Sequence, residues 1–206
     1  MYIPVVFRSV SKLDNEESLC LYSDEELIVQ TQQTNSTLPF SILYDRYATK
    51  IYNKCYSFSK NQSEAEDLTQ DVFLKLFTKL HTFKGQSKFS TWLYSFTYNF
   101  CVNYVTRDKA RKKSRVTDSI DNHEYRLSVM EDIKDEDLFE LQATVLNKVL
   151  NKIAPEEKAI LLLKYQDDVT IKELQILLNI SESAVKMRLK RARIKVMEVY
   201  KDTFEA

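Results

Sequence analysis

Four residues between positions 92 and 107 combine the side-chain types that recognise an unpaired nucleic-acid base. If this stretch is helical, they fall near one another on one face: Trp92, Asn99, Asn103 and Arg107. An aromatic ring offers a stacking surface, and amides offer donors and acceptors to base edges. We therefore predict a site for unpaired bases here, with Asn99 as its main base contact. Trp92 fits equally well as a support beneath the preceding loop.

A second group lies on the basic stretch 182–196, which holds six basic residues and one acidic residue. Val185, Leu189 and Ala192 recur there at helical spacing, so the basic side chains fall on the other sides of the helix. Such a helix suits the major groove, where its first residues reach base edges and its later cations hold phosphates. The predicted DNA contacts are Ser183, Ala184, Lys186, Met187, Lys190, Arg191 and Arg193. The alternative is a solvated basic helix that packs only on its neighbours.

A third group of residues is acidic and is therefore not suited to bind DNA. In the stretch 63–80, a buried stripe is predicted at Leu68, Val72, Phe73, Leu76 and Leu80. That stripe leaves four polar residues on the outer face: Asp67, Gln70, Asp71 and Lys75. An acidic patch can steer the approach of a basic or polar protein surface, so we predict a protein partner here. A merely solvated face is the alternative.

Residues for catalysis are missing from this sequence. His81 and His123 stand alone, with no metal-ligand or triad spacing, and no glycine-rich phosphate loop exists. Cys20, Cys55 and Cys101 are far apart, which predicts reduced structural thiols rather than a metal site or disulfide. We expect no catalytic residue, no metal and no cofactor, and therefore no enzyme.

Charge is distributed unevenly although the net charge is zero. Residues 40–113 carry net +7 and residues 151–206 net +2, while residues 114–150 between them carry net −5. Two basic modules joined by an acidic connector are typical of a nucleic-acid binder. No apolar run approaches the roughly 20 residues that span a bilayer, and the start lacks the flanks of a signal peptide. We therefore expect a cytoplasmic protein without membrane insertion.

The elements that must position these groups are predicted to be helices. One glycine and three prolines in 206 residues disfavour the many tight turns of strand-rich folds. We predict an all-α protein of two small domains, at 23–110 and 138–206, joined by a flexible acidic linker at 111–137. Residues 1–22 are expected to be loosely ordered. Expected helix starts include Ser23, a Ser63–Glu66 capping box, Ser90 or Thr91, and Pro155.

The stretch from 170 to 196 has the pattern of a helix-turn-helix. Leu174, Leu177 and Leu178 mark the first helix, and Asn179 stands where the chain must turn. Asn tolerates the left-handed conformation better than most residues. Ile180 is predicted as the buried plug of the turn, and Ser181 as the cap of the second helix.

Two segments together resemble the sigma-70 family of RNA polymerase specificity subunits, in its compact extracytoplasmic-function group. The first runs from Ala65 to Leu76 and continues, across a glycine-containing loop, from Phe83 to Tyr94 and on to Asn99, Asn103 and Arg107. The second runs from Leu150 to Val196. The resemblance covers roughly residues 23–110 and 138–200. Each motif alone is moderately specific, whereas both in this order are highly specific.

The resemblance implies a role for each group of residues. Asp67, Gln70, Asp71 and Lys75 would dock on the clamp helices of core RNA polymerase. The loop and the following helix would capture flipped bases of the promoter −10 element through Lys84, Lys88, Phe89, Trp92, Asn99, Asn103 and Arg107. The helix-turn-helix would read the −35 duplex. Such factors are often held inactive by an anti-sigma factor, which is therefore a candidate partner, although nothing in this chain identifies one.

The sequence departs from the family pattern in and around the helix-turn-helix. Leu174-Gln175 stands where the family commonly has Ile-Ala, and Asn179 replaces the usual glycine of the turn. Ala184 and Met187 replace hydroxyl residues that are common on the recognition helix. We therefore expect a different set of −35 bases to be read.

Two alternative functions would explain less of the sequence. A stand-alone helix-turn-helix regulator explains residues 138–200 but leaves the motifs at 63–108 unused. A helical adaptor that binds only proteins leaves the basic helix unexplained.

Overall fold

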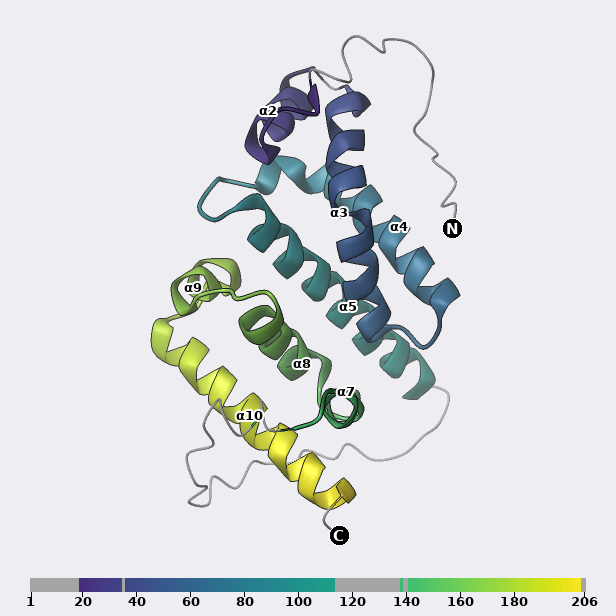
Figure 1. Ribbon diagram of the computed structural model, residues 1–206, viewed down its shortest axis with the longest axis vertical. Helices are drawn as coiled ribbons and strands as arrows, with labels where there is room; N and C mark the ends of the chain where they lie inside the picture. The colour runs from purple at the N-terminus through teal and green to yellow at the C-terminus, as the bar shows by residue number, and fades with distance from the viewer. Residues whose placement is uncertain (1–18, 35, 114–137, 139–140, 205–206) are drawn as a thin grey trace. The chain divides into compact units, whose positions relative to one another are not determined.

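The computed structural model describes residues 19–34, 36–113, 138 and 141–204, and in these residues it contains helices and no strand (Figure 1). The predicted all-α class is thereby confirmed. Most of the segment expected to be loosely ordered and residues 114–137 of the expected linker lie outside the described residues.

Contacts divide the chain into two compact units, residues 1–93 and 94–206. The division falls inside α5 (Phe89–Lys113), which is one continuous helix. The predicted domains at 23–110 and 138–206 instead place a boundary near the end of that helix. Those two ranges stay predictions.

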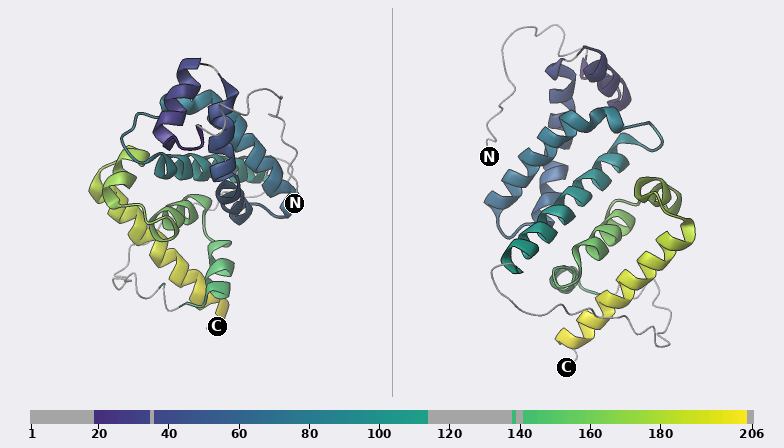
Figure 2. Two further views of the ribbon diagram at one scale, coloured as in Figure 1. Left: turned by 45° about the horizontal axis from the view of Figure 1, so that its top comes forward. Right: turned by 180° about the vertical axis from the view of Figure 1, so that it is seen from behind.

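In the first unit, α3 (Thr37–Phe58) packs against both α2 (Asp24–Thr34) and α4 (Gln62–Lys79), as the two views of Figure 2 show. A 3-10 turn, η1 (Leu80–Thr82), follows α4. The predicted buried stripe is confirmed at all five positions, which are Leu68, Val72, Phe73 and Leu76 on α4 and Leu80 on η1.

Helix caps in this unit follow the sequence only in part. Ser23 and Glu26 exchange hydrogen bonds, so the predicted start of α2 is confirmed. The predicted Ser63 cap is wrong, because Asn61 Oδ1 accepts from the Glu64 backbone N–H at 2.9 Å. Glu64 completes that cap by accepting from the Lys60 N–H at 2.5 Å.

In the second unit, α10 (Glu182–Phe204) packs against α7 (Ala143–Leu150), α8 (Pro155–Leu161) and α9 (Ile171–Leu178). The predicted helix start at Pro155 is confirmed. A π-helical turn, η2 (Leu162–Gln166), extends α8, and no sequence signal predicted it. Asp168 then takes a positive φ of 52° and turns the chain toward α9.

Candidate functional site

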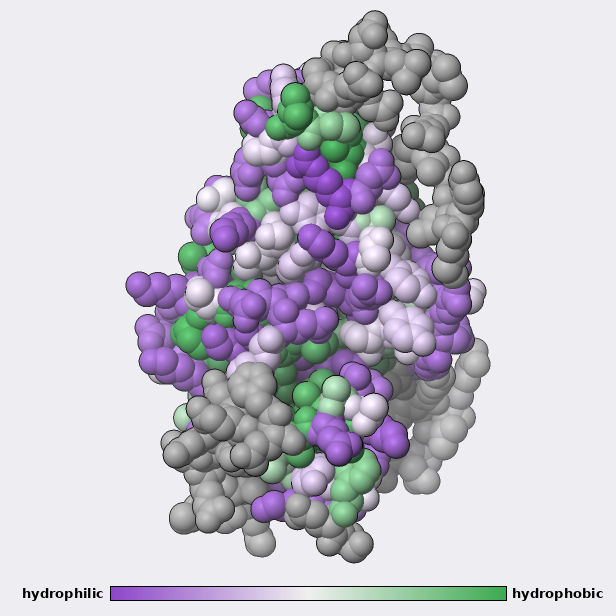
Figure 3. All heavy atoms as spheres, in the orientation of Figure 1, coloured by the Kyte–Doolittle hydropathy of each residue, from purple (hydrophilic) through white to green (hydrophobic). Residues whose placement is uncertain are grey.

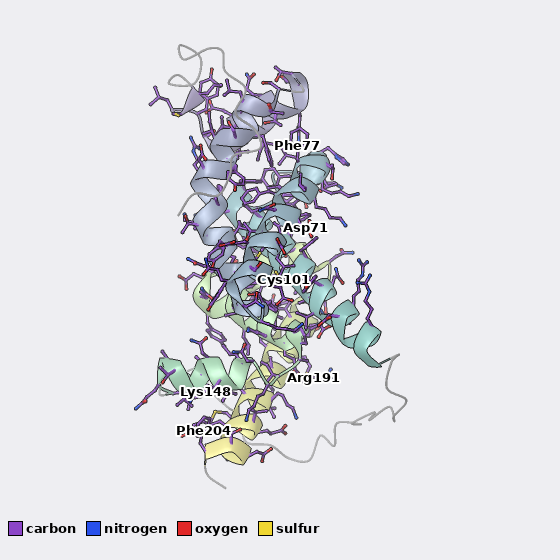
Figure 4. The ribbon with its side chains drawn as sticks, turned by 90° about the vertical axis from the view of Figure 1, so that its right-hand side faces the viewer. Asp71, Phe77, Cys101, Lys148, Arg191 and Phe204 are labelled. Atoms are coloured by element: carbon purple, nitrogen blue, oxygen red, sulfur yellow. The ribbon has the colours of Figure 1, made fainter. Side chains whose placement is uncertain are left out.

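The outer face of α4 carries the predicted polar group. Its four members are all exposed: Asp67, Gln70, Asp71 and Lys75. The opposite side of the helix is fully buried, so packing fixes which way this face points. Figure 4 labels Asp71 on this helix.

Leu74 also belongs to this face, and the sequence prediction missed it. Its side chain is 57% exposed although it stands between Asp71 and Lys75 on a helix that buries its other leucines. Its place outside the apolar stripe was the available signal. We use the name clamp face for the set Asp67, Gln70, Asp71, Leu74 and Lys75.

The loop between η1 and α5 presents two cations. Lys84 and Lys88 are exposed, and Gly85 between them has a φ of +66°. No atom lies within 4 Å of where a Cβ on Gly85 would sit, so the glycine is needed for backbone conformation and not for space. The predicted caps Ser90 and Thr91 are wrong, because α5 already begins at Phe89, and the Trp92 N–H donates to the Lys88 carbonyl at 3.1 Å.

An aromatic cluster supports this loop. The Phe89 ring lies 5.5 Å from the rings of Tyr47 and Phe83 and 6.0 Å from that of Trp92. Phe89 is only 1% exposed, so its side chain packs within the cluster. Its predicted contact with DNA stays a prediction. Trp92 joins the cluster through Phe83 at 5.5 Å and remains partly exposed.

Hydrogen bonds connect the start of α2 to α3, the helix that carries Tyr47. Arg46 donates to the Asp24 carboxylate at 2.7 Å and to the Tyr22 carbonyl at 2.7 Å. The Tyr47 hydroxyl donates to the other oxygen of Asp24. Tyr47 is therefore held at both its ring and its hydroxyl, so the aromatic cluster rests on a fixed support.

Farther along α5, the three remaining predicted contacts are exposed. Asn99, Asn103 and Arg107 recur every four residues, and so follow one side of the helix. Helical spacing on this helix also favours a core stripe of Leu93, Phe96, Phe100 and Tyr104, and of these four only Leu93 is buried. Tyr98 and Cys101 take the buried positions instead, whereas Phe96, Phe100 and Tyr104 are half-buried.

The predicted helix-turn-helix is present between 170 and 204. Asn179 adopts the left-handed conformation at φ 52° and ψ 49°, as predicted for the turn. Ser181 Oγ accepts from the Ala184 N–H at 3.2 Å and caps α10, also as predicted. Ile180 is half-buried rather than fully buried.

The recognition helix α10 turns its buried stripe of Val185, Leu189 and Ala192 toward the domain. The predicted DNA contacts Ser183, Lys186, Met187 and Arg191 are exposed, and Ala184 and Lys190 are half-exposed. Lys186 forms a salt bridge with Glu182 at 2.6 Å. Figure 4 labels Arg191 on this helix.

Arg193 differs from the other predicted contacts of α10. Its side chain is half-buried, and its guanidinium donates to the Tyr165 hydroxyl at 3.1 Å. Its Nε atom is buried as well. Arg193 therefore connects α10 to the π-helical turn, and its role as a DNA contact stays a prediction.

The described residues offer little to an enzymatic reaction. His81 is exposed, as expected of a surface histidine, and His123 lies outside the described residues. Cys55 and Cys101 are buried, and none of the three cysteines forms a disulfide. In the described part of the chain, no group of three or more His, Cys, Asp or Glu side chains could hold a metal ion. A cavity of about 420 Å³ beside α7, α8 and α10 has Asn147, Tyr165 and Gln166 as its polar side chains.

The surface in Figure 3 is largely hydrophilic, with small separate hydrophobic patches. Of the described helices, none combines the length and apolar character needed to cross a membrane.

Comparison with known proteins assigns both modules. Residues 43–111 match the family model described as Sigma-70 region 2, and residues 144–196 match Sigma-70, region 4. No curated protein matches the chain.

Two solved structures share its fold. One is the sigma factor RpoE in complex with the anti-sigma factor NepR from Bartonella quintana, with 19% identity, 80% of this chain and 98% of that chain covered, and a TM-score of 0.54. The other is CnrH in complex with the cytosolic domain of CnrY. Its sequence identity is 19%, the match covers 87% of this chain and 98% of that chain, and the TM-score is 0.56.

Proposed function

Because this chain belongs to the sigma-70 family, whose members are non-enzymatic transcription initiation factors, we propose that it binds core RNA polymerase and directs it to specific promoters. In this proposal the clamp face binds the polymerase. The loop at 84–88 and α5 bind the −10 element, and α10 binds the −35 element. The pairing of region 2 with region 4 fits the extracytoplasmic-function group.

The clamp face is the observation that carries the proposal. Its two aspartates, one amide, one leucine and one lysine are exposed on a helix whose other side is buried, so packing fixes the direction in which they face. Carboxylates repel DNA and attract a basic or polar protein surface. A helix-turn-helix regulator that works without polymerase has no use for this face.

The −10 element is proposed to meet Lys84 and Lys88 on the loop and Asn99, Asn103 and Arg107 along α5. The two lysines and Arg107 would follow phosphates, and Asn99 would contact the edge of a flipped base. Phe89 is left out because it is buried, and it acts by supporting the loop. Trp92 combines both roles, since its ring belongs to the cluster and is partly exposed.

Energies limit what this site does alone. Separating duplex costs on average about 1.4 kcal/mol per stacked step. Stacking one flipped base on an aromatic ring returns about 1–3 kcal/mol. One or two such pockets can trap the first opened base but cannot hold several base pairs apart. The protein would therefore nucleate melting, and the polymerase would complete it.

Other partners and the location follow from the same proposal. A sigma factor works where polymerase and chromosome meet, which is the bacterial cytoplasm. The two similar structures were solved with an anti-sigma factor and with the cytosolic domain of CnrY. An anti-sigma factor is accordingly proposed as a regulator of this chain.

The test is fluorescence anisotropy of the labelled full chain titrated with bacterial core RNA polymerase. Wild type is compared with Asp71→Lys, and Asp45→Lys is the matched control because Asp45 is an exposed aspartate on a different helix, α3. We expect tight binding that only Asp71→Lys weakens. No binding by wild type would instead favour a stand-alone regulator, and equal loss in both variants would remove the clamp face from the proposal.

A further inference from the structure

Met187 lies on the exposed side of α10, near the N-terminal end of the helix. Its side chain is 44% exposed, whereas Val185 and Leu189 on either side of it in sequence are 0% and 3% exposed. Two positions along an α-helix correspond to a rotation of about 200°. Met187 therefore points directly away from the domain core, in the direction that a docked recognition helix turns toward the bases.

The neighbours of Met187 on this face divide by chemistry. One turn earlier stand Ser183 and Ala184, and one turn later stand Lys190 and Arg191. The cations lie toward the middle of the helix, where they suit phosphates. The first turns, which approach base edges most closely, offer a hydroxyl, a methyl group and a thioether.

Polar groups near the start of α10 already have partners within the chain. Lys186 is paired with Glu182 at 2.6 Å, and the hydroxyls of Ser183 and Ser181 lie 3.0 Å apart. No Asn, Gln or Arg stands on α10 before Arg188, so a bidentate amide contact to adenine is lacking at its first turns. Lys186, which is paired with Glu182, is the one side chain there of a type that contacts guanine.

We propose that Met187, assisted by Ala184, selects a thymine in the −35 element by contact with its 5-methyl group. This inference rests on the proposed reading of −35 DNA by α10. The thymine methyl is the one apolar group that a base pair presents in the major groove. A thioether placed against any other base edge covers donors or acceptors without replacing their hydrogen bonds with water, which is unfavourable.

The size of the selectivity is modest. Burial of one methyl-sized group corresponds to a change in affinity of roughly threefold to fivefold. Methionine is flexible and adapts its contacts, so a neighbouring base step is partly tolerated. The structure thus favours a thymine preference at one position over an absolute requirement.

The first experiment selects −35 sequences from a randomised promoter library with holoenzyme reconstituted from core polymerase and the full chain. Wild type is compared with Met187→Gln and with Ile176→Ala, whose wild-type side chain is an exposed apolar residue of similar exposure (48%) on α9. We expect wild type and Ile176→Ala to enrich the same thymine. Met187→Gln should replace it with adenine, because a glutamine amide pairs with adenine N6 and N7.

The second experiment replaces that thymine with deoxyuridine, which lacks only the methyl group. Holoenzyme binding should fall threefold to fivefold for wild type and clearly less for Met187→Ala, in which only Ala184 can still contact the methyl group. Enrichment of the same base by wild type and Met187→Gln, or an equal deoxyuridine effect in wild type and Met187→Ala, would overturn the inference while leaving the sigma function intact. Failure of wild-type holoenzyme to select any sequence would overturn the proposed function and this inference together.

Discussion

Leu74 is the apolar member of the clamp face, and its replacement by serine should weaken polymerase binding without unfolding the protein. Complete burial of a leucine side chain contributes about 1.5–3 kcal/mol. The side chain is 57% exposed in the free protein, so covering that part would contribute about 0.9–1.7 kcal/mol. Because 1.4 kcal/mol is a tenfold change in affinity, we expect Leu74→Ser to raise the Kd roughly 5- to 20-fold.

The measurement is a competition titration, in which unlabelled variants displace labelled wild type from core polymerase. Val29→Ser is the matched control, since Val29 is an apolar residue with 45% exposure on α2, outside the clamp face. Both variants should unfold within a few degrees of wild type, because exposed substitutions usually change stability by no more than 0.5 kcal/mol. Wild-type affinity for Leu74→Ser, or equal losses for both variants, would refute the placement of the polymerase contact on this face.

Three predictions concern stability. Asn179→Gly should raise the free energy of unfolding by up to about 1 kcal/mol, because glycine adopts the left-handed conformation without strain. The control Asn147→Gly, inside α7, should lower the free energy of unfolding. Thermal melts in which both variants shift the melting temperature in the same direction would contradict this prediction. Burial lowers the pKa of Lys158 from its usual 10.5 to about 8, so the folded protein binds fewer protons than the unfolded chain between these values. Urea titrations should therefore show a free energy of unfolding that rises from pH 8 to 10 in wild type relative to Lys158→Met. Parallel pH profiles for the two proteins would exclude a lowered pKa of Lys158. Phe89→Ala should lower the free energy of unfolding by about 3–5 kcal/mol and Trp92→Ala by less, since only Phe89 is fully buried. A larger loss for Trp92→Ala in urea titrations would show that Phe89 is not the central residue of the aromatic cluster.

Helices with one apolar stripe were predictable from sequence. The five stripe positions on α4 and η1 are all buried, because a helix that packs on one side must repeat its apolar residues every three or four positions. That repeat also fixed the direction of Asp71 and its neighbours. The turn at Asn179 and the cap at Ser181 were predictable for a different reason, since few residues satisfy those backbone positions.

Prediction failed where several residues could play the same part. Asn61 and Ser63 are both good caps, and two positions along the chain separate the right choice from the wrong one. On α5 aromatic residues occur on most sides, so spacing alone could not separate buried Tyr98 from half-buried Phe100. Arg193 follows the basic pattern of α10, but only the tertiary structure brings the Tyr165 hydroxyl within 3.1 Å of it.

The small number of base-reading groups on α10 bears on how promoter choice is achieved. A good bidentate contact gives about 1–3 kcal/mol of discrimination, and a thymine methyl gives less. Arg193 is bonded to Tyr165 and Lys186 to Glu182, so part of the basic side of the helix is engaged within the chain, and we expect α10 to discriminate weakly alone. Under the proposed function, binding of the clamp face to polymerase would convert the search for the −35 element into an intramolecular step at high effective concentration. Weak readings of the −35 and −10 elements would then multiply, so a short chain with a sparse recognition helix could select a promoter once it is held on the enzyme.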